Sequence, residues 1–175
     1  SLEARDCDVV LSSCLDATNP AKFWLGTLQG VFEVDIRDGS MHHFSLDAGN
    51  HAGIEAPSGL QSLVRSLKMP NDSTLALGTW GGGLCLLNPL TGVWRSYLFQ
   101  TPDPVSQVRN SVPVLEWKSP YELWVGLGRE ENGIGIMDIR TTQIHIEPGP
   151  QSPRCIHTDR AGNVWMGSNQ GLFLK

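Results

Sequence analysis

A short pattern built around a glycine recurs four times along this chain of 175 residues, and it constrains the fold more than any other feature. In each copy an apolar run leads into a glycine, a short polar link follows, and a second apolar run begins after another glycine. The leading glycines, which we call the anchor glycines, are Gly26, Gly78, Gly126 and Gly167, and they lie 52, 48 and 41 residues apart. Periods of about 40 to 50 residues are typical of β-propeller blades, whereas helical arrays repeat at about 34 residues.

Each anchor glycine also has a strand-like stretch upstream of it. These stretches are Val9–Cys14, Leu63–Leu67, Val112–Trp117 and Arg154–His157. Three copies continue through a polar turn into one more strand-like stretch, so that a repeat contains four strands joined by turns and a glycine hairpin. This is the antiparallel meander of a propeller blade. Because helical periodicity is absent over any ten residues, the sequence predicts an all-β chain.

The repeats divide the chain into a short N-terminal tail at 1–7 and a single β-propeller segment at 8–175. The blades are expected at approximately 8–47, 60–99, 111–147 and 153–175. The last blade is truncated, because the sequence stops at Lys175, within or just after its third strand. Closed propellers have about four to eight complete blades. We therefore expect about four consecutive blades from a larger propeller.

The glycine cluster in LALGTWGGGLCLLNPLTG, residues 75–92, could also suggest a phosphate-binding loop. Such a loop needs a helix directly after its glycines, because the helix N-terminus supplies the amide donors. Here Pro89 would interrupt that helix in its second turn, and no Gly-Lys-Ser or Gly-Lys-Thr follows. The cluster is interpreted as the hairpin between the second and third strands of a blade, where positive φ and close packing exclude larger residues.

Composition narrows the classes of partner. The net charge of −5 gives no electrostatic reason to expect nucleic acid. No apolar stretch approaches the roughly 20 residues that a membrane span needs, so we expect no membrane contact by this segment. The four cysteines show no C-x-x-C spacing and are expected to be small buried apolar residues. No cofactor or metal is expected.

The stretch from Asp159 to Leu172, with the pattern D-x-x-G-x-x-W-x-G-S-x-x-G-L, resembles the two-component regulator propeller repeat. GTWGGGLCLLNPLTGVWRSY resembles the same repeat through its Gly-Gly-Leu and its Asn-Pro-x-Thr-Gly turn. Four such copies cover most of the chain, although the second has Ala76 where the others have tryptophan, and the third has a longer hairpin. Proteins with these repeats are typically bacterial membrane sensors, many of which respond to carbohydrates.

The resemblance implies a non-catalytic sensor segment that lies outside the cytoplasm, in the periplasm, and controls a histidine kinase whose catalytic domains are absent from this chain. The alternatives are a fragment of a propeller-type glycan hydrolase or lyase, and a plain protein-interaction scaffold. A hydrolase would need paired carboxylates. Glu130 and Glu131 are neighbours, but on an expected exposed hairpin, where a solvated pair is the ordinary interpretation. The sequence therefore predicts no catalytic residue.

Other polar residues have structural interpretations. His42 and His43 are adjacent on an expected strand, so their side chains point to opposite faces and cannot readily share a metal ion. Asp159 is expected to cap its own turn, with Gly162 taking the positive φ. Trp24, Trp124 and Trp165 occupy equivalent positions in their repeats and are expected to pack in the core.

The topology predicts where a ligand would bind. In a four-stranded meander the hairpins between second and third strands emerge at the same end as the connections between blades, which include the long linkers 45–62 and 99–111. Loops that gather on one face usually mark the binding face of a repeat protein. The candidate ligand-binding residues on this face are Trp80, Arg129, Glu130 and Asn132, and the expected ligand is an oligosaccharide. We also expect self-association into a dimer, because the first and last blades lack neighbours.

Overall fold

The computed structural model describes residues 9–46, 63–70, 74–99, 110–128 and 132–175. In these ranges the chain forms strands and turns and contains no α-helix. The strands form four antiparallel sheets, and within each sheet neighbouring strands follow one another in the sequence. The strands are β1 (Val10–Leu15), β2 (Lys22–Thr27), β3 (Gly30–Asp35), β4 (Met41–Phe44), β5 (Val64–Lys68), β6 (Leu75–Thr79), β7 (Leu84–Leu87), β8 (Trp94–Tyr97), β9 (Val114–Trp117), β10 (Glu122–Gly126), β11 (Asn132–Asp138), β12 (Gln143–Gln151), β13 (Cys155–Thr158), β14 (Val164–Ser168) and β15 (Gly171–Leu174).

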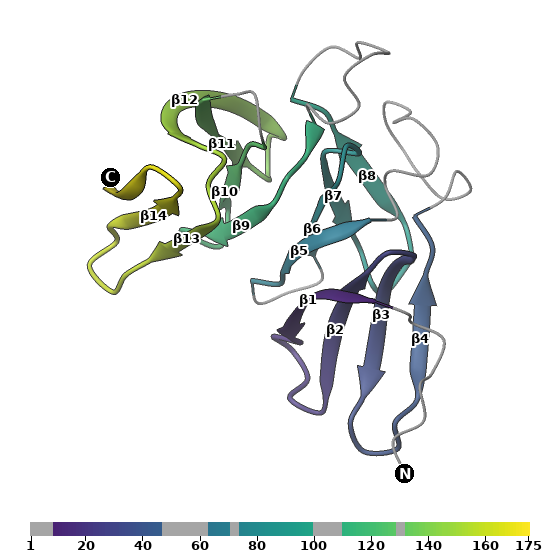
Figure 1. Cartoon of the computed structure of the whole chain (residues 1–175). Helices are drawn as coiled ribbons and strands as arrows, with labels where there is room; N and C mark the ends of the chain where they lie inside the picture. Colours follow the sequence, from purple (N-terminus) through teal and green to yellow (C-terminus); the bar gives the residue numbers. More distant parts are fainter. Residues whose placement is uncertain (1–8, 47–62, 71–73, 100–109, 129–131) are drawn as a thin grey trace.

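The four sheets are successive blades of a β-propeller, arranged as an open ring (Figure 1). Blade 1 is β1–β4, blade 2 is β5–β8 and blade 3 is β9–β12, and among the described residues blade 4 has three strands, β13–β15. The first strand of each blade is innermost and packs against the first strand of the next: β1 against β5, β5 against β9 and β9 against β13. The prediction of an all-β propeller with a truncated last blade is confirmed.

Turns of the predicted chemistry join the strands. The Asp159 carboxylate accepts the backbone N–H groups of Ala161 and Asn163 at 2.9 and 3.0 Å, and Gly162 has a φ of 86°. In the Asn-Pro-x-Thr-Gly turn, Asn88 accepts the N–H of Leu90 at 2.9 Å. In these turns the side-chain oxygens of Asp159 and Asn88 accept backbone N–H groups that have no partner in the strand pairing.

The tryptophan that precedes most anchor glycines is tied to the turn before it. The Asp16 carboxylate accepts the Trp24 indole N–H at 3.0 Å, and Asp159 accepts that of Trp165 at 2.9 Å. In blade 3 the acceptor of the Trp124 indole N–H is Glu122, at 2.7 Å. In blades 1 and 4 the Asp and the Trp of the repeat are therefore a hydrogen-bonded pair that joins the first turn of the blade to its second strand, whereas in blade 3 both members of the pair lie in the second strand.

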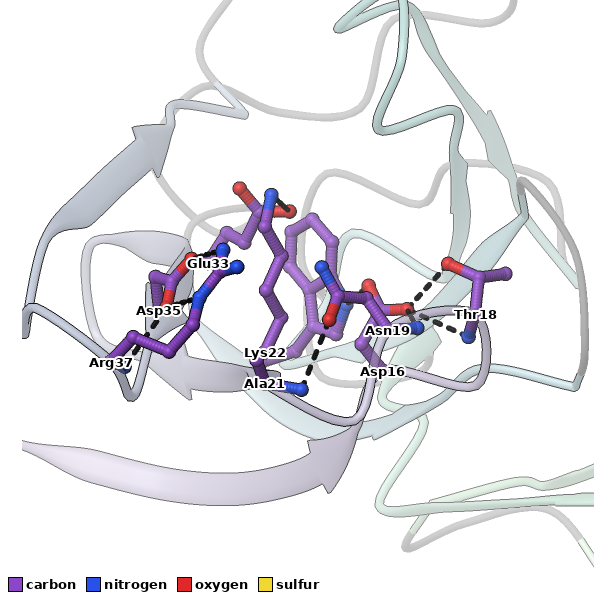
Figure 2. Close-up of polar contacts among 9 residues, drawn as sticks. Asp16, Thr18, Asn19, Ala21, Lys22, Glu33, Asp35 and Arg37 are labelled. Carbon is purple, nitrogen blue, oxygen red and sulfur yellow. Dashed lines mark hydrogen bonds and ion pairs between the residues drawn. The ribbon is translucent and has the colours of Figure 1, made fainter.

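Asp16 collects several further donors (Figure 2). Its Oδ1 accepts the N–H and the hydroxyl of Thr18 at 2.8 and 2.7 Å, and the N–H of Asn19 at 2.9 Å. Burial by itself would raise the pKa of Asp16, but the hydrogen bonds from Thr18, Trp24 and Asn19 outweigh it and lower that pKa below its ordinary value of 3.8. The carboxylate is thus held charged in a largely buried position.

Blade 2 lacks this pair, because Ala76 stands in the place of the tryptophan. Ala76 is fully buried in the core between blades 2 and 3. Trp117 of blade 3 packs against the same core, and its indole N–H points to the Lys68 carbonyl at 3.5 Å. At this interface the following blade supplies the tryptophan.

Three apolar cores lie between successive blades. The core between blades 1 and 2 includes Trp24, Leu75 and Leu77. That between blades 2 and 3 includes Leu123 and Met137, and the smaller core between blades 3 and 4 is built from Trp124, Ile134, Ile136, Ile156, Val164 and Met166. Cys85 is fully buried, and burial raises the pKa of its thiol to about 12. Cys155 is exposed, so the expectation of a buried residue is wrong there, because it lies on the last blade.

Each anchor glycine lies on the second strand of its blade, beside the innermost strand, and the first three also lie against the start of the next blade. A Cβ on Gly26 would meet Ser12 of its own blade and, at 2.7 Å, Val64 of the next. A Cβ on Gly78 would meet Ser66 and Val112, and one on Gly126 would meet Val114 and, at 2.7 Å, Pro153. At Gly167, Cys155 of its own blade is the only neighbour within 4 Å among the described residues. Within the described part of the chain, the fourth anchor glycine therefore has its own inner strand as a neighbour and no following blade.

The two terminal blades carry complementary apolar faces. Phe23 and Leu25 in blade 1 correspond by their distance from the anchor glycine to Leu75 and Leu77, which pack against the preceding blade. Leu15 on the same face of blade 1 is 76% exposed. In blade 4 Leu172, paired with Gly167 on the outward face, is 70% exposed. Blade 1 thus exposes the face that in blade 2 packs against the preceding blade. Blade 4 exposes the face that in the other blades packs against the following blade.

We expect substitution of Asp16 by alanine to destabilise the fold by about 1–3 kcal/mol at pH 7, because the buried Trp24 indole N–H loses its acceptor. The pKa of Asp16 is lowered on folding, so its contribution is present above the unfolded pKa and is lost as the pH falls through the folded value. Urea unfolding at pH 7 and in acid measures both effects. Asp38→Ala, which removes only an exposed acceptor of the Ser40 N–H, is the control. Equal stability of the two variants at pH 7 would contradict this role.

We expect the 175-residue chain to form a dimer in which blade 4 of each copy packs on blade 1 of the other, giving a ring of eight blades. Two contacts of this kind would bury area typical of stable interfaces, on the order of 1,000 Å² or more. Light scattering after size exclusion should give a mass near twice 19.1 kDa at micromolar concentration.

Matched substitutions test the geometry of this dimer. Leu172→Lys should yield monomers, because it places a charge on the outward face of blade 4. Leu90→Lys changes an equally exposed leucine (85%) in a turn and should leave the dimer intact. A monomeric wild-type chain, or a dimer that tolerates Leu172→Lys, would reject the arrangement.

Candidate functional site

A hollow of about 620 Å³ lies where the four blades meet, at the end of the molecule that carries the hairpins between second and third strands. Its walls come from every blade. They combine residues of the innermost strands, residues of the hairpins, and residues at the ends of the connections between blades, namely Leu11, Leu28, Leu63, Arg65, Trp80, Ser111, Pro113, Gly128, Ser152, Pro153, Arg154 and Asn169. We call this hollow the central cavity.

Two positions of the repeat supply eight of these residues. The first, the inner position, directly precedes the residue of the innermost strand that lies at the anchor glycine, and it is Leu11, Arg65, Pro113 or Arg154 in blades 1 to 4. The second, the hairpin position, is two residues after the anchor glycine, and it is Leu28, Trp80, Gly128 or Asn169. The repeat therefore determines which two positions of each blade line the cavity, whereas the residue types at these positions differ from blade to blade.

Arg65 and Trp80 form the most distinctive contact in the cavity wall. The Arg65 guanidinium lies over the Trp80 ring, 4.4 Å from its centroid. Arg65 sits at an irregularity in the pairing of β5 with β6, between Val64 and Ser66, and such bulges redirect a side chain away from the sheet. The Trp80 backbone N–H donates to the Leu63 carbonyl at 3.0 Å, which fixes the hairpin against the innermost strand.

Blade 4 places a second arginine in the cavity wall. The Arg154 backbone N–H donates to the Gly167 carbonyl at 2.8 Å, and its Nε–H donates to the Asn169 side-chain oxygen at 3.3 Å. The inner and hairpin positions of blade 4 are thus joined to each other, as they are in blade 2. Arg65 is half-buried, whereas Arg154 is exposed.

The sequence-predicted site residues have different outcomes. Trp80 lines the cavity. Arg129 and Glu130 lie outside the described residues. Asn132 is the first residue of β11, and its backbone pairs with Gln151, next to the cavity residues Ser152 and Pro153. These assignments to ligand binding remain predictions.

Arg65 and Arg154 were missed by reasoning from the sequence, although a signal for them exists. Both precede the small residue that faces the anchor glycine, Ser66 and Cys155 respectively. Aligning the innermost strands on their anchor glycines brings both arginines to the same repeat position, and that alignment is the signal.

The described carboxylates lie elsewhere. Asp35, Asp138 and Asp159 are at the opposite end, where turns join first to second and third to fourth strands. Hydrogen bonds from Arg37 hold the pKa of Asp35 well below its usual range, those from Arg140 lower the pKa of Asp138 to about 2, and those from Trp165 and Asn163 do the same for Asp159. They are engaged in turn structure. Over the described ranges, no three His, Cys, Asp or Glu residues are grouped so that they could hold a metal ion.

No protein-family model and no curated protein matches the sequence. Solved structures do resemble the chain. Two structures of the extracellular domain of BT4673 from B. thetaiotaomicron, described as a putative one-component and as a putative hybrid two-component system, superpose with a TM-score of 0.74 at 20% and 19% identity, over 99% of this chain and 22% of those chains. The WD40 propeller domain of Doa1 gives 0.70 at 14% identity, over 94% and 49%, and the computationally designed Ika4 gives 0.68 at 18%, over 100% and 94%.

The chain has a β-propeller fold. At these identities the likeness shows the fold alone, and the chain spans less than a quarter of the BT4673 domain. Among the described residues, none belongs to a helix that is long and apolar enough to cross a membrane.

Proposed function

We propose that this chain is a non-catalytic recognition segment of a bacterial extracytoplasmic sensor of the two-component type, and that it binds carbohydrate in the central cavity. The repeat pattern around Asp159 and Trp165 supports the sensor class, as does the likeness of the fold to the extracellular domain of BT4673. The full protein would carry a histidine kinase beyond this segment, with the propeller in the periplasm.

The observation that carries the proposal is the presence of an aromatic ring in a cavity walled by all four blades. Trp80 stands at a hairpin position, partly exposed, beside hydrogen-bonding side chains such as Ser111, Ser152 and Asn169. Sites for small ligands combine apolar or aromatic walls with a few placed polar groups. A sugar ring has an apolar face and a rim of hydroxyl groups, which is the complement of this wall.

Binding of a ligand in the central cavity can change the arrangement of the blades. A ligand in the central cavity touches several blades at once, so its affinity depends on how the blades are spaced. Differential affinity for two arrangements is what shifts their populations. The propeller would bias the sensor through the relative position of its blades, without chemistry of its own.

We expect Trp80→Ala to weaken glycan binding about 30-fold or more, because truncating a tryptophan that anchors a ligand typically costs about 2 kcal/mol. The measurement is a glycan array of neutral and acidic oligosaccharides, followed by calorimetry on the ligands that bind. Tyr121→Ala is the matched control. Tyr121 is also a partly exposed aromatic under an arginine, with Arg140 at 4.7 Å, but it lies at the opposite end of the blades. Absence of any binding glycan, or equal effects of the two substitutions, would reject the proposed site.

A further inference from the structure

We infer that the central cavity selects an anionic ligand, an oligosaccharide bearing carboxylate groups, and that Arg65 and Arg154 are the residues that recognise its charge. The inference rests on the proposed function and names the ligand class of the same cavity. It is carried by the chemistry of the inner positions, which place a cation from blade 2 and another from blade 4 in one hollow.

The charge of the cavity is opposite to that of the protein. The whole chain has a net charge of −5, yet the cavity wall contains two arginines and no aspartate or glutamate among its described residues. Lys22, Arg37, Lys68, Lys118, Arg140 and Lys175 each form an ion pair with a carboxylate. Within the described part of the chain Arg65, Arg95, Arg154 and Arg160 have no such partner, and of these four Arg65 and Arg154 line the cavity. A cationic cavity concentrates anions from solution.

The orientation of the Arg65 guanidinium leaves its in-plane N–H groups available for a ligand. A guanidinium stacks through its flat face, while its five N–H groups point outward in the plane. The Trp80 ring occupies the face, so stacking does not use the in-plane N–H groups. A planar fork of donors held in one orientation matches a carboxylate, which it can bind through two parallel hydrogen bonds.

Arg154 is held in a comparable way. Its Nε–H is directed to Asn169, which leaves the terminal amino groups of the guanidinium for a ligand. Arg65 lies in β5 and Arg154 directly precedes β13. Each side chain is oriented by a contact with the hairpin position of its own blade, and a positioned donor costs less entropy to use than a mobile one. The apolar side chains Leu11 and Leu28 of blade 1 complete the wall, so an anionic sugar would meet charge on one part of the cavity and apolar surface on another.

Inorganic sulfate tests the anion site without knowledge of the glycan. We expect the Nε–H resonances of Arg65 and Arg154 to shift with saturation when sulfate is added to the 175-residue chain, and the shifts to weaken as sodium chloride rises. Arg95 on β8, an exposed arginine outside the cavity, is the internal control. Linear shifts of equal size at all three arginines would overturn the inference.

Glycans then decide the ligand class. We expect acidic oligosaccharides to bind at least tenfold more tightly than their carboxyl-reduced counterparts. Arg65→Gln and Arg154→Gln should each weaken acidic binding about tenfold to a hundredfold, since hydrogen bonds to charged groups contribute that much, while Arg95→Gln has no effect. Equal binding of acidic and reduced glycans would overturn the inference and leave the proposed function standing. If no glycan binds, the proposed function is wrong, and the sulfate titration alone decides whether the cavity recognises anions.

Discussion

The architecture depends on the absence of a side chain at three points, the anchor glycines Gly26, Gly78 and Gly126. These glycines lie on the second strands of their blades, and a Cβ at any of them would overlap both the innermost strand of the same blade and the residues that begin the next blade. This contact sets the spacing and rotation between blades, because the flanking strands follow the innermost ones. It also places the neighbouring inner position at the wall of the central cavity. The same glycine therefore determines both how the blades pack and which residues a ligand meets.

The fold was predictable because these glycines leave a periodic mark in the sequence, whereas the exact strand limits were not. The stretch from Val112 to Trp117 was expected as one strand, but β9 begins at Val114. The Val112 N–H instead donates to the Thr79 carbonyl of blade 2 at 2.9 Å, and Pro113 has no N–H to offer. A hydrogen bond between blades depends on tertiary structure, and strand-forming preference alone does not reveal it.

The same limit applies to burial and to the candidate site. Trp24 and Trp124 are buried and Trp165 is partly exposed, although their places in the repeat are equivalent, because only the first two have a following blade. Trp80 could be found from the sequence, since a tryptophan in a hairpin link is conspicuous. Arg65 could not be found by propensity, because it lies in what reads as a core strand. Its place in the repeat could be found by aligning the innermost strands on their anchor glycines, but the irregularity in the pairing of β5 at Arg65 is seen only in the structure.

The two ends of the blades use the same side-chain chemistry for different purposes. At the turn end Arg140 lies over Tyr121, and its Nε–H also donates to the Asp138 carboxylate at 3.0 Å, so its charge is neutralised within a turn. At the cavity end Arg65 lies over Trp80 without a carboxylate among the described residues. Stacking orients both guanidinium groups, but only the second keeps its charge directed at a hollow. At the turn end, Asp35, Asp138 and Asp159 accept hydrogen bonds from arginines, backbone N–H groups or an indole N–H group. The described residues of the cavity wall include two arginines and no carboxylate, so this acidic chain has a cationic cavity at its other end.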